Sequence, residues 1–229
     1  GDLVALVPGA VVWRGGRRGK PEPVNYEARG STAVEYTLDG MPYMAVGPDS
    51  LAVDPALFPL SFLDRVEVER WPGRLEVHLY TRRHDRLAPR SGIAAGTGTD
   101  RFAMYAGNFE QRFQSGFGVV AAGDYFRSPA TTGTTGDFTN STLWLQGSYL
   151  RPRVGLQYQL ITASTDRDAF TGVGGGQGQP YEGKRTDAQF RASFGHVLDR
   201  TGPRLDVVYA RTGWDSAGIA QQVNQIGGV

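Results

Sequence analysis

Six long segments lie in the C-terminal part of the chain, and most of them alternate apolar and polar residues. In one of them, Val154 and Leu156 alternate with Gly155 and Gln157. Successive side chains of a β-strand point to opposite faces, so this period of two predicts strands with one apolar face. Each segment has roughly 10–13 residues, about twice the usual strand length of about 5–6 in soluble sheets. The segments are Arg101–Phe113, Gly116–Arg127, Thr139–Leu150, Arg153–Thr165, Arg185–Leu198 and Arg204–Trp214.

The connections between these segments alternate in length. Arg151-Pro152 and Asp199–Pro203 are short, whereas Ser128–Asp137 and Asp166–Lys184 are long and polar. Strands of about 9–11 residues cross a bilayer when they are tilted. Short turns at one end and long loops at the other are typical of outer-membrane barrels. The pattern therefore predicts at least six antiparallel strands of a transmembrane outer-membrane β-barrel.

Composition excludes several other classes of protein. No apolar run approaches the ~18–20 residues that a spanning helix needs, which excludes a helical membrane protein. The chain has no cysteine, so a disulfide framework and a Cys-based zinc or iron–sulfur site are excluded. Its 24 basic and 23 acidic residues nearly balance, so the net charge indicates no polyanion-binding field and no nucleic-acid partner.

The first 83 residues contain shorter β-type runs that are separated by turn signals. Asp39-Gly40, directly after Val34–Leu38, predicts a tight hairpin because both residue types tolerate positive φ. Trp71-Pro72-Gly73 separates Val66–Glu69 from Leu75–Tyr80, and both of these runs alternate strictly. These runs predict a small sheet ahead of the long strands.

No motif of catalytic or metal chemistry stands out. The three histidines show neither HxxxH nor HxH spacing, and no serine lies in a Gly-x-Ser-x-Gly elbow. Glu67, Glu69 and Glu76 could suggest a glycosidase pair, but solvent- or lumen-facing carboxylates on alternating strands are the simpler interpretation. We therefore expect no catalytic residue, no metal site and no cofactor. The histidines are His78, His84 and His196.

Two further groups of side chains have both a functional and a structural interpretation. Gly15-Gly16, among basic residues, loosely resembles a phosphate loop but lacks Gly-Lys-Ser/Thr, so we interpret it as a solvated loop. Aromatic residues on the long strands could stack against carbohydrate, but an interfacial girdle is the interpretation that we favour. These aromatic residues are Tyr105, Phe109, Phe126, Tyr149, Tyr158, Phe190 and Tyr209.

Five segments within residues 1–83 follow, in order and at similar spacing, the motifs of a known domain. On these segments the chain resembles the plug domain of TonB-dependent outer-membrane receptors. Residues 92–214 resemble the barrel of that family only in the length and the mostly alternating pattern of their predicted strands. The series in order is more specific than any single piece. The segments are Asp2-Leu3 with Val7-Pro8-Gly9-Ala10, Ala28-Arg29-Gly30, Tyr36–Pro42, Leu63–Val68 with Arg70–Gly73, and Tyr80–Arg83.

The resemblance implies a mainly β chain with two parts. A small α/β plug-like domain at residues 1–88, with its N-terminal part missing, would precede the first strands of an outer-membrane β-barrel at residues 89–229, incomplete in this chain. It implies a bacterial outer-membrane location, with outer-membrane lipid around the strands. It also implies TonB-dependent transport of a scarce large nutrient of the siderophore, cobalamin or oligosaccharide class, by ligand binding and plug displacement without enzymatic chemistry. The partner would be a TonB-type energy-coupling protein, whose contact segment, the TonB box, is not in this chain.

The site residues that the resemblance implies lie in the plug motifs. The family is thought to pair two plug arginines with barrel glutamates, and Arg29 and Arg70 look like the matching positions. The plug apex and the long loops, above all Asp166–Lys184, would bind the small-molecule or oligosaccharide ligand. The implied motif and ion-pairing residues are Arg29, Gly30, Asp39, Gly40, Glu67, Arg70, Pro72 and Gly73.

Two other functions stay open. The family usually has a Gly/Ser/Ala-rich stretch between the Pro-Gly and the final Thr-Arg, whereas here Gly73-Arg74-Leu75 leads directly to Glu76–Thr81. This departure favours a non-transporting structural or assembly subunit of an outer-membrane complex, built on a degenerate plug-barrel fold, with envelope subunits as partners. A soluble all-β binding module is the third hypothesis, and it would require shorter strands with polar outward faces.

Overall fold

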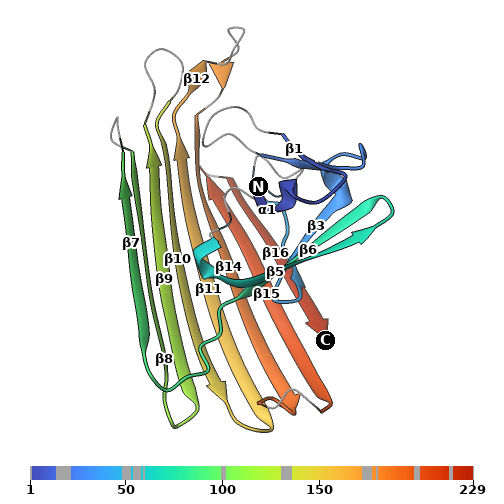
Figure 1. Cartoon of the computed structure of the whole chain (residues 1–229), viewed down its shortest axis with the longest axis vertical. Helices are drawn as coiled ribbons and strands as arrows, with labels where there is room; N and C mark the ends of the chain where they lie inside the picture. The colour runs from blue at the N-terminus through green and yellow to red at the C-terminus, as the bar shows by residue number, and fades with distance from the viewer. Residues whose placement is uncertain are drawn as a thin grey trace.

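The computed structural model of the chain is mainly β and consists of a tall curved sheet with a smaller lobe packed against one face (Figure 1). Within the described residues, the helical elements are the short helix α1 (Asp2–Ala5) and two 3-10 turns, η1 (Ser31–Ala33) and η3 (Leu60–Phe62). No described helix has the length and apolar character needed to cross a membrane. The structure describes residues 2–13, 22–47, 53, 58, 60–98, 102–129, 136–171, 177–178, 180–198, 202–216 and 219–228.

Eight strands form the large sheet, in the order β16-β15-β14-β11-β10-β9-β8-β7, and every neighbouring pair is antiparallel. The six predicted segments are confirmed as β8, β9, β10, β11, β14 and β15. A small pair, β12 with β13, lies between β11 and β14 in the sequence. The bounds are β7 Arg90–Thr97, β8 Ala103–Arg112, β9 Phe117–Ser128, β10 Phe138–Leu150, β11 Val154–Arg167, β12 Phe170–Thr171, β13 Gln177–Gly178, β14 Tyr181–Gly195, β15 Arg204–Ser216 and β16 Ile219–Gly228.

The large sheet differs from the sequence prediction at its edges and in one loop. β7 is rich in Gly and Ala and carries little alternation, but pairing with β8 holds it in the sheet. β16 lies in residues 215–229, a Gly- and Gln-rich stretch whose sequence is compatible with a further loop or with the start of another strand. The prediction of one long loop at Asp166–Lys184 is wrong at both ends, because the β11–β14 ladder continues to the pair Arg167↔Tyr181.

Residues 2–81, which we call the N-terminal lobe, form a four-stranded sheet in the order β4-β3-β6-β5 and a separate pair, β1 with β2. The pairs Leu38↔Met41 and Trp71↔Arg74 leave two-residue turns at Asp39-Gly40 and Pro72-Gly73, which confirms both predicted turns. The predicted solvated loop around Gly15-Gly16 and most of residues 48–59 lie outside the described residues. The bounds are β1 Ala10–Val12, β2 Val24–Tyr26, β3 Val34–Leu38, β4 Met41–Pro42, β5 Leu63–Trp71 and β6 Arg74–Thr81.

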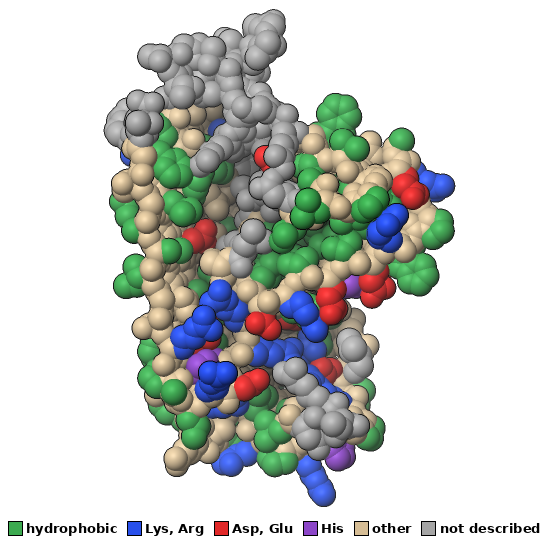
Figure 2. All heavy atoms as spheres, viewed as in Figure 1, with side chains coloured by type: hydrophobic (Ala, Val, Ile, Leu, Met, Phe, Trp, Pro, Cys, Tyr) green, Lys and Arg blue, Asp and Glu red, His purple; other side chains and the backbone are tan. Residues whose placement is uncertain are grey.

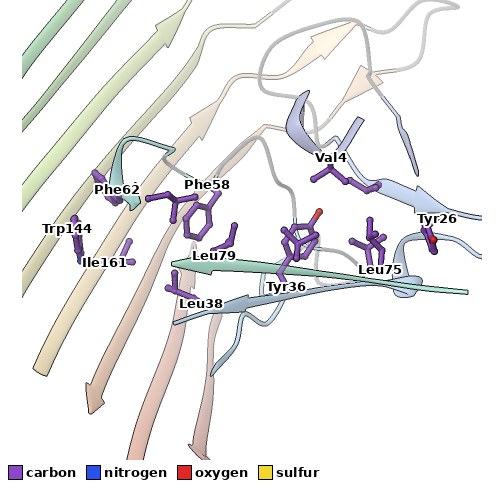
Figure 3. Close-up of a cluster of buried hydrophobic side chains, with 14 of the residues drawn as sticks. Val4, Tyr26, Tyr36, Leu38, Phe58, Phe62, Leu75, Leu79, Trp144 and Ile161 are labelled. Carbon is purple, nitrogen blue, oxygen red and sulfur yellow. The ribbon is translucent and has the colours of Figure 1, made fainter. Parts of the chain in front are cut away.

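The N-terminal lobe buries its apolar face, which includes Leu75, Val77 and Leu79 as the alternation predicts. Next to β5, Phe62 stacks on Trp144 of β10, with 5.4 Å between ring centroids (Figure 3). Trp144 interrupts the polar face of its strand in the sequence, and it is 0% exposed in the structure. The interruption therefore marks a place where the N-terminal lobe docks on the large sheet.

The two faces of the large sheet have opposite characters. The inner face, toward the N-terminal lobe, buries polar residues such as Asn140, Thr142 and Gln146. The outer face exposes large apolar side chains, among them Leu143 at 48% exposure, and Figure 2 shows such side chains along the outer edge of the sheet. A water-soluble sheet with one buried face has the reverse arrangement, with apolar residues inside and polar residues outside. The outer face is therefore suited to an apolar surrounding.

Candidate functional site

The β3–β4 turn is the point at which the N-terminal lobe forms polar contacts with the large sheet. Asp39 and Gly40 have positive φ values of 50° and 83°, as a hairpin turn of the I′ type requires. The Asp39 N–H donates to the Leu79 carbonyl at 2.8 Å, which fixes the turn to β6. Asp39 is only 2% exposed. The turn thus places a carboxylate in the interior of the molecule.

Three donors surround the Asp39 carboxylate. The Thr81 N–H donates to Oδ1 at 3.0 Å and the Thr81 hydroxyl donates to Oδ2 at 2.7 Å. The third donor is Gln159 Nε2 of β11, 3.0 Å from Oδ2. A buried carboxylate without such partners would be strongly unfavourable. The bond to Gln159 links the N-terminal lobe to the large sheet across 120 residues of sequence.

The hydrogen-bond network continues along the inner face of the large sheet. Gln159 Nε2 also donates to Gln189 of β14, and Arg191 of β14 donates from Nη2 to the Asp39 carbonyl. All five residues are buried. We call Asp39, Thr81, Gln159, Gln189 and Arg191 the polar knot.

A carboxylate on β15 balances the charge of Arg191. Arg191 Nη1 donates to Asp206 Oδ2 at 2.7 Å, and Arg204 donates to both carboxylate oxygens of Asp206 at 2.6 Å. Charge-assisted hydrogen bonds of this kind are roughly twice as strong as neutral ones. Asp206 therefore holds Arg191 in the position from which it reaches the polar knot.

A second polar contact joins the segment that directly follows the N-terminal lobe to β8. Glu110, 3% exposed, places Oε1 3.5 Å from Arg82 Nη1 and Oε2 3.3 Å from His84 Nδ1. The sequence interpretation expected arginine–glutamate pairing but did not identify these residues. The signal that could have found them is the Thr81-Arg82-Arg83 end of the motif series, followed by a glutamate in the first long predicted strand.

The Arg-Gly and Pro-Gly motifs come together at the tip of the β5–β6 hairpin. The Gly73 N–H donates to Glu27 Oε2 at 2.8 Å, and a Cβ on Gly73 would lie 2.6 Å from Arg29 Cζ. Gly73 and Gly30 have φ values of 76° and 87°, which favour glycine. Figure 1 shows this hairpin extending away from the large sheet. The structure thus separates these motif residues from Asp39-Gly40, which faces the large sheet.

Glu67 and Arg70 both lie on β5. Glu67 pairs with Arg65 at 3.2 Å, and burial together with the hydrogen bond to Glu67 raises the pKa of Tyr80. Arg70 and Arg29 are exposed, and neither forms an ion pair with another described residue. Their pairing with barrel glutamates stays a prediction.

On the other side of the polar knot, Arg185 of β14 also reaches the N-terminal lobe. Its guanidinium carbon lies 3.7 Å from the centroid of the Tyr43 ring, and its Nη1 donates to the Met44 carbonyl at 2.8 Å. Asp187 orients Arg185 through bonds of 2.7 and 3.0 Å. Burial raises the pKa of Tyr43 well above its ordinary value, although Arg185 opposes the shift. The stacked guanidinium adds a cation–π contact between the two parts.

Trp214 of β15 fits against two glycines, one from each part of the molecule. A Cβ on Gly47, whose φ is 90°, would lie 2.8 Å from the Trp214 ring, and a Cβ on Gly183 would overlap it. Gly47 also donates its N–H to Gln221 Oε1 at 3.1 Å. No pattern in the sequence signals these contacts, because the three segments are far apart along the chain.

Glu69, Glu76 and His78 lie together on the β5–β6 hairpin, with one ligand atom of each within 4.8 Å of the others. The spacing of these three residues along the sequence matches no metal-binding motif, so no motif signals this group. The hairpin register through Pro72-Gly73, which places Glu69 opposite Glu76, could have revealed it. Side chains of these kinds can hold a cation. Arg74 already binds Glu76, so part of the negative charge is neutralised without a metal.

Comparison with known proteins identifies the fold. No family model matches the sequence, and no curated protein matches it. Two solved mutant structures of the ferric enterobactin receptor PfeA from Pseudomonas aeruginosa match with TM-scores of 0.63 and 0.62, each at 12% sequence identity. The matches cover 98% and 97% of this chain and 41% of the receptor chain. The chain thus spans less than half the length of these receptors, and the likeness shows a distant fold of the TonB-dependent receptor type.

Proposed function

We propose that the chain acts in ligand-gated transport across the bacterial outer membrane, with the N-terminal lobe as its plug. In this proposal residues 1–88 are a plug-like domain and residues 89–229 supply barrel strands. The observation that carries the proposal is the polar knot, in which Asp39 of a small lobe is hydrogen-bonded to Gln159 and Arg191 on the polar inner face of a tall sheet.

A hydrogen-bonded contact suits a part that has to move. The net contribution of one hydrogen bond is only about 0.5–1.5 kcal/mol, because water replaces the lost partner. Water entering the space between the lobe and the large sheet could therefore replace Asp39 as the partner of Gln159. An interface made only of apolar side chains has no such substitute and would resist separation.

The outer face and the strand lengths support a lipid surrounding. The predicted barrel strands range from 10 residues in β8 to 15 in β14, at or above the ~9–11 that a tilted spanning strand needs. Their exposed apolar side chains would contact outer-membrane lipid. The long connections β9–β10 and β11–β14 would then lie on one side of the membrane, and the short turns β8–β9 and β10–β11 on the other.

The proposal also names partners and a ligand class. A TonB-type energy-coupling protein would drive displacement of the lobe, and the ligand would be a scarce large nutrient of the siderophore, cobalamin or oligosaccharide class. The matched structures are named as receptors for ferric enterobactin, which favours a siderophore among these classes. The chain would carry out no covalent chemistry. The neighbours that support this assignment are receptors.

An uptake assay tests the transport function. A strain that lacks the gene should lose accumulation of one labelled ligand from a panel of ferric siderophores, cobalamin and oligosaccharides. Wild-type protein should restore it, and dissipating the proton gradient should abolish the restored uptake. Asp64→Asn, which changes an exposed carboxylate on β5, should also restore uptake and serves as the control. Normal accumulation of every ligand in the deletion strain would contradict the proposal.

One observation favours the second candidate, a structural or assembly subunit. Trp71 pairs directly with Arg74, so β5 and β6 are joined by Pro72-Gly73 alone and no Gly-rich stretch intervenes. A plug without that stretch would have fewer residues that can change conformation during gating. Purification of the protein only as a stoichiometric component of a larger envelope complex, with uptake unchanged by deletion, would establish this function instead.

A further inference from the structure

A hollow with an excess of basic side chains lies between the end of the N-terminal lobe and the inner face of the large sheet. Its volume is about 220 Å³. The segment Arg83–Asp85 borders one side, and residues of β8, β9, β10, β11, β14 and β15 form the other. The residues near 118, 148, 155 and 193 place it toward the short turns, at the opposite end from the long connections. Figure 2 shows basic side chains gathered below the lobe on the viewed face.

Three arginines of the hollow are largely buried. The side chains of Arg112, Arg191 and Arg204 are 13%, 8% and 22% exposed. Asp206 contacts two of them, and Asp85, whose side chain is 66% exposed, lies 3.8 Å from Arg112. Burying positive charge is unfavourable unless enough negative charge accompanies it. These three arginines have two carboxylates beside them, Asp85 and Asp206, so the hollow keeps an excess of positive charge and favours an added anion.

Arg191, which lines the hollow, also has a guanidinium donor that lacks a partner within the part of the chain that the structure describes. Arg191 Nε is buried, and no hydrogen-bond partner is found for it among the described residues, although the other two nitrogens of this guanidinium are bonded. Buried donors in folded proteins are nearly always satisfied by a protein group, a water or an ion. Neutral donors such as Gln157 and Ser193 also line the hollow. Guanidinium groups beside amide and hydroxyl donors are a typical phosphate-binding set.

From this arrangement we propose that the hollow binds a compact phosphate-type anion that bridges the segment Arg83–Asp85, just after the N-terminal lobe, and the large sheet. An anion would offset the excess of guanidinium charge. The volume is below the ~300 Å³ at which drug-sized ligands begin to fit, so the ligand is a small group and not a large nutrient. The source of the phosphate is either free inorganic phosphate or the headgroup of a lipid. Binding at this site would strengthen attachment of the lobe to the large sheet. This effect would be separate from any ligand bound at the end of the sheet that carries the long connections.

Calorimetric titration of the purified full chain with inorganic phosphate tests the proposal. The protein would be held in detergent at constant ionic strength with sodium chloride. One saturable binding event is expected, and saturating phosphate should raise the melting temperature of the wild-type protein. Arg112→Gln should weaken binding about tenfold or more, because a charge-assisted bond is lost, and Arg112→Lys should weaken it less. Arg153→Gln, an exposed arginine in the nearby turn outside the hollow, should bind like the wild type.

A parallel titration with short-chain phosphatidate identifies the source of the phosphate. Binding of phosphatidate but not of free phosphate would assign the site to a lipid headgroup, and binding of both would assign it to the phosphate group itself. The proposal is overturned if neither titration saturates, or if Arg153→Gln weakens binding as much as Arg112→Gln. The wild-type melting shift keeps the test valid even if Arg112→Gln fails to fold. These measurements read binding directly, so their failure would leave the transport proposal untouched.

Discussion

The N-terminal lobe and the large sheet meet through two contacts of opposite physical character. Around Phe62 and Trp144 the contact is apolar, and water offers no substitute for it. Around Asp39 the contact is a network of hydrogen bonds whose partners water could replace. We therefore expect the apolar contact to supply most of the free energy that holds the lobe on the large sheet. The polar knot would fix the position of the lobe on that sheet.

The largest effect is expected from Trp144→Ala. Removing this fully buried ring should lower the free energy of unfolding by about 3–5 kcal/mol, because both the burial and the stacking on Phe62 are lost. Chemical denaturation of the detergent-solubilised protein, followed by far-ultraviolet circular dichroism, measures the change. Leu143→Ala on the exposed outer face is the matched control and should cost much less in detergent. Equal losses for the two variants would mean that the lobe contributes nothing to the burial of Trp144.

Breaking the polar knot should have a smaller and more local effect. Asp39→Ala leaves donors on Thr81 and Gln159 without their acceptor and should cost about 1.5–3 kcal/mol. Amide hydrogen exchange should show faster exchange in β3, β4 and β6, with β10 and β11 still protected. Asp64→Asn should exchange like the wild type. If exchange rises equally in β10 and β11, the knot is part of the sheet's own stability and not an attachment of the lobe.

A steric change tests the packing around Trp214, which Gly47 of the N-terminal lobe also contacts. Gly183→Ala places a methyl group where the Trp214 ring lies and should cost about 1–2 kcal/mol by overpacking. Gly147→Ala is the matched control, since a Cβ there meets no atom within 4 Å. Thermal unfolding compares the two variants. Similar melting temperatures would show that the Trp214 ring can move aside without loss.

The smallest effect is expected at the cation–π contact. Tyr43→Leu removes the ring under Arg185 and should cost about 0.5–1 kcal/mol, whereas Tyr43→Phe keeps the ring and should cost less. Denaturation curves of the two variants separate stacking from the contribution of the hydroxyl. A larger loss for Tyr43→Phe than for Tyr43→Leu would show that the hydroxyl, and not the stacking, stabilises this contact.

Local chemistry accounts for what the sequence could predict. The turns at Asp39-Gly40 and Pro72-Gly73, and the alternating strands, depend on neighbouring residues and can be recognised from them. β7 could not be recognised in the same way, because its Gly- and Ala-rich sequence has little pattern and pairing with β8 places it in the sheet.

The polar knot could not be predicted because its partners are distant along the chain. No local signal indicates that Asp39 meets Gln159. A hint of docking came from Trp144, a large apolar residue on a polar face, since such an exception needs an apolar partner from elsewhere. An apolar residue on an otherwise polar strand face thus indicated where the lobe docks, whereas the regular alternation indicated only the strands.

The positions of the four tryptophans give the molecule an internal optical reporter. Trp13 and Trp71 are more than half exposed, so their emission is already that of indole in water. Trp144 and Trp214 belong to the large sheet, and the N-terminal lobe helps to cover both of them. Departure of the lobe would shift their fluorescence to longer wavelength and open them to quenching by iodide. Movement of the lobe could therefore be followed in the unlabelled protein.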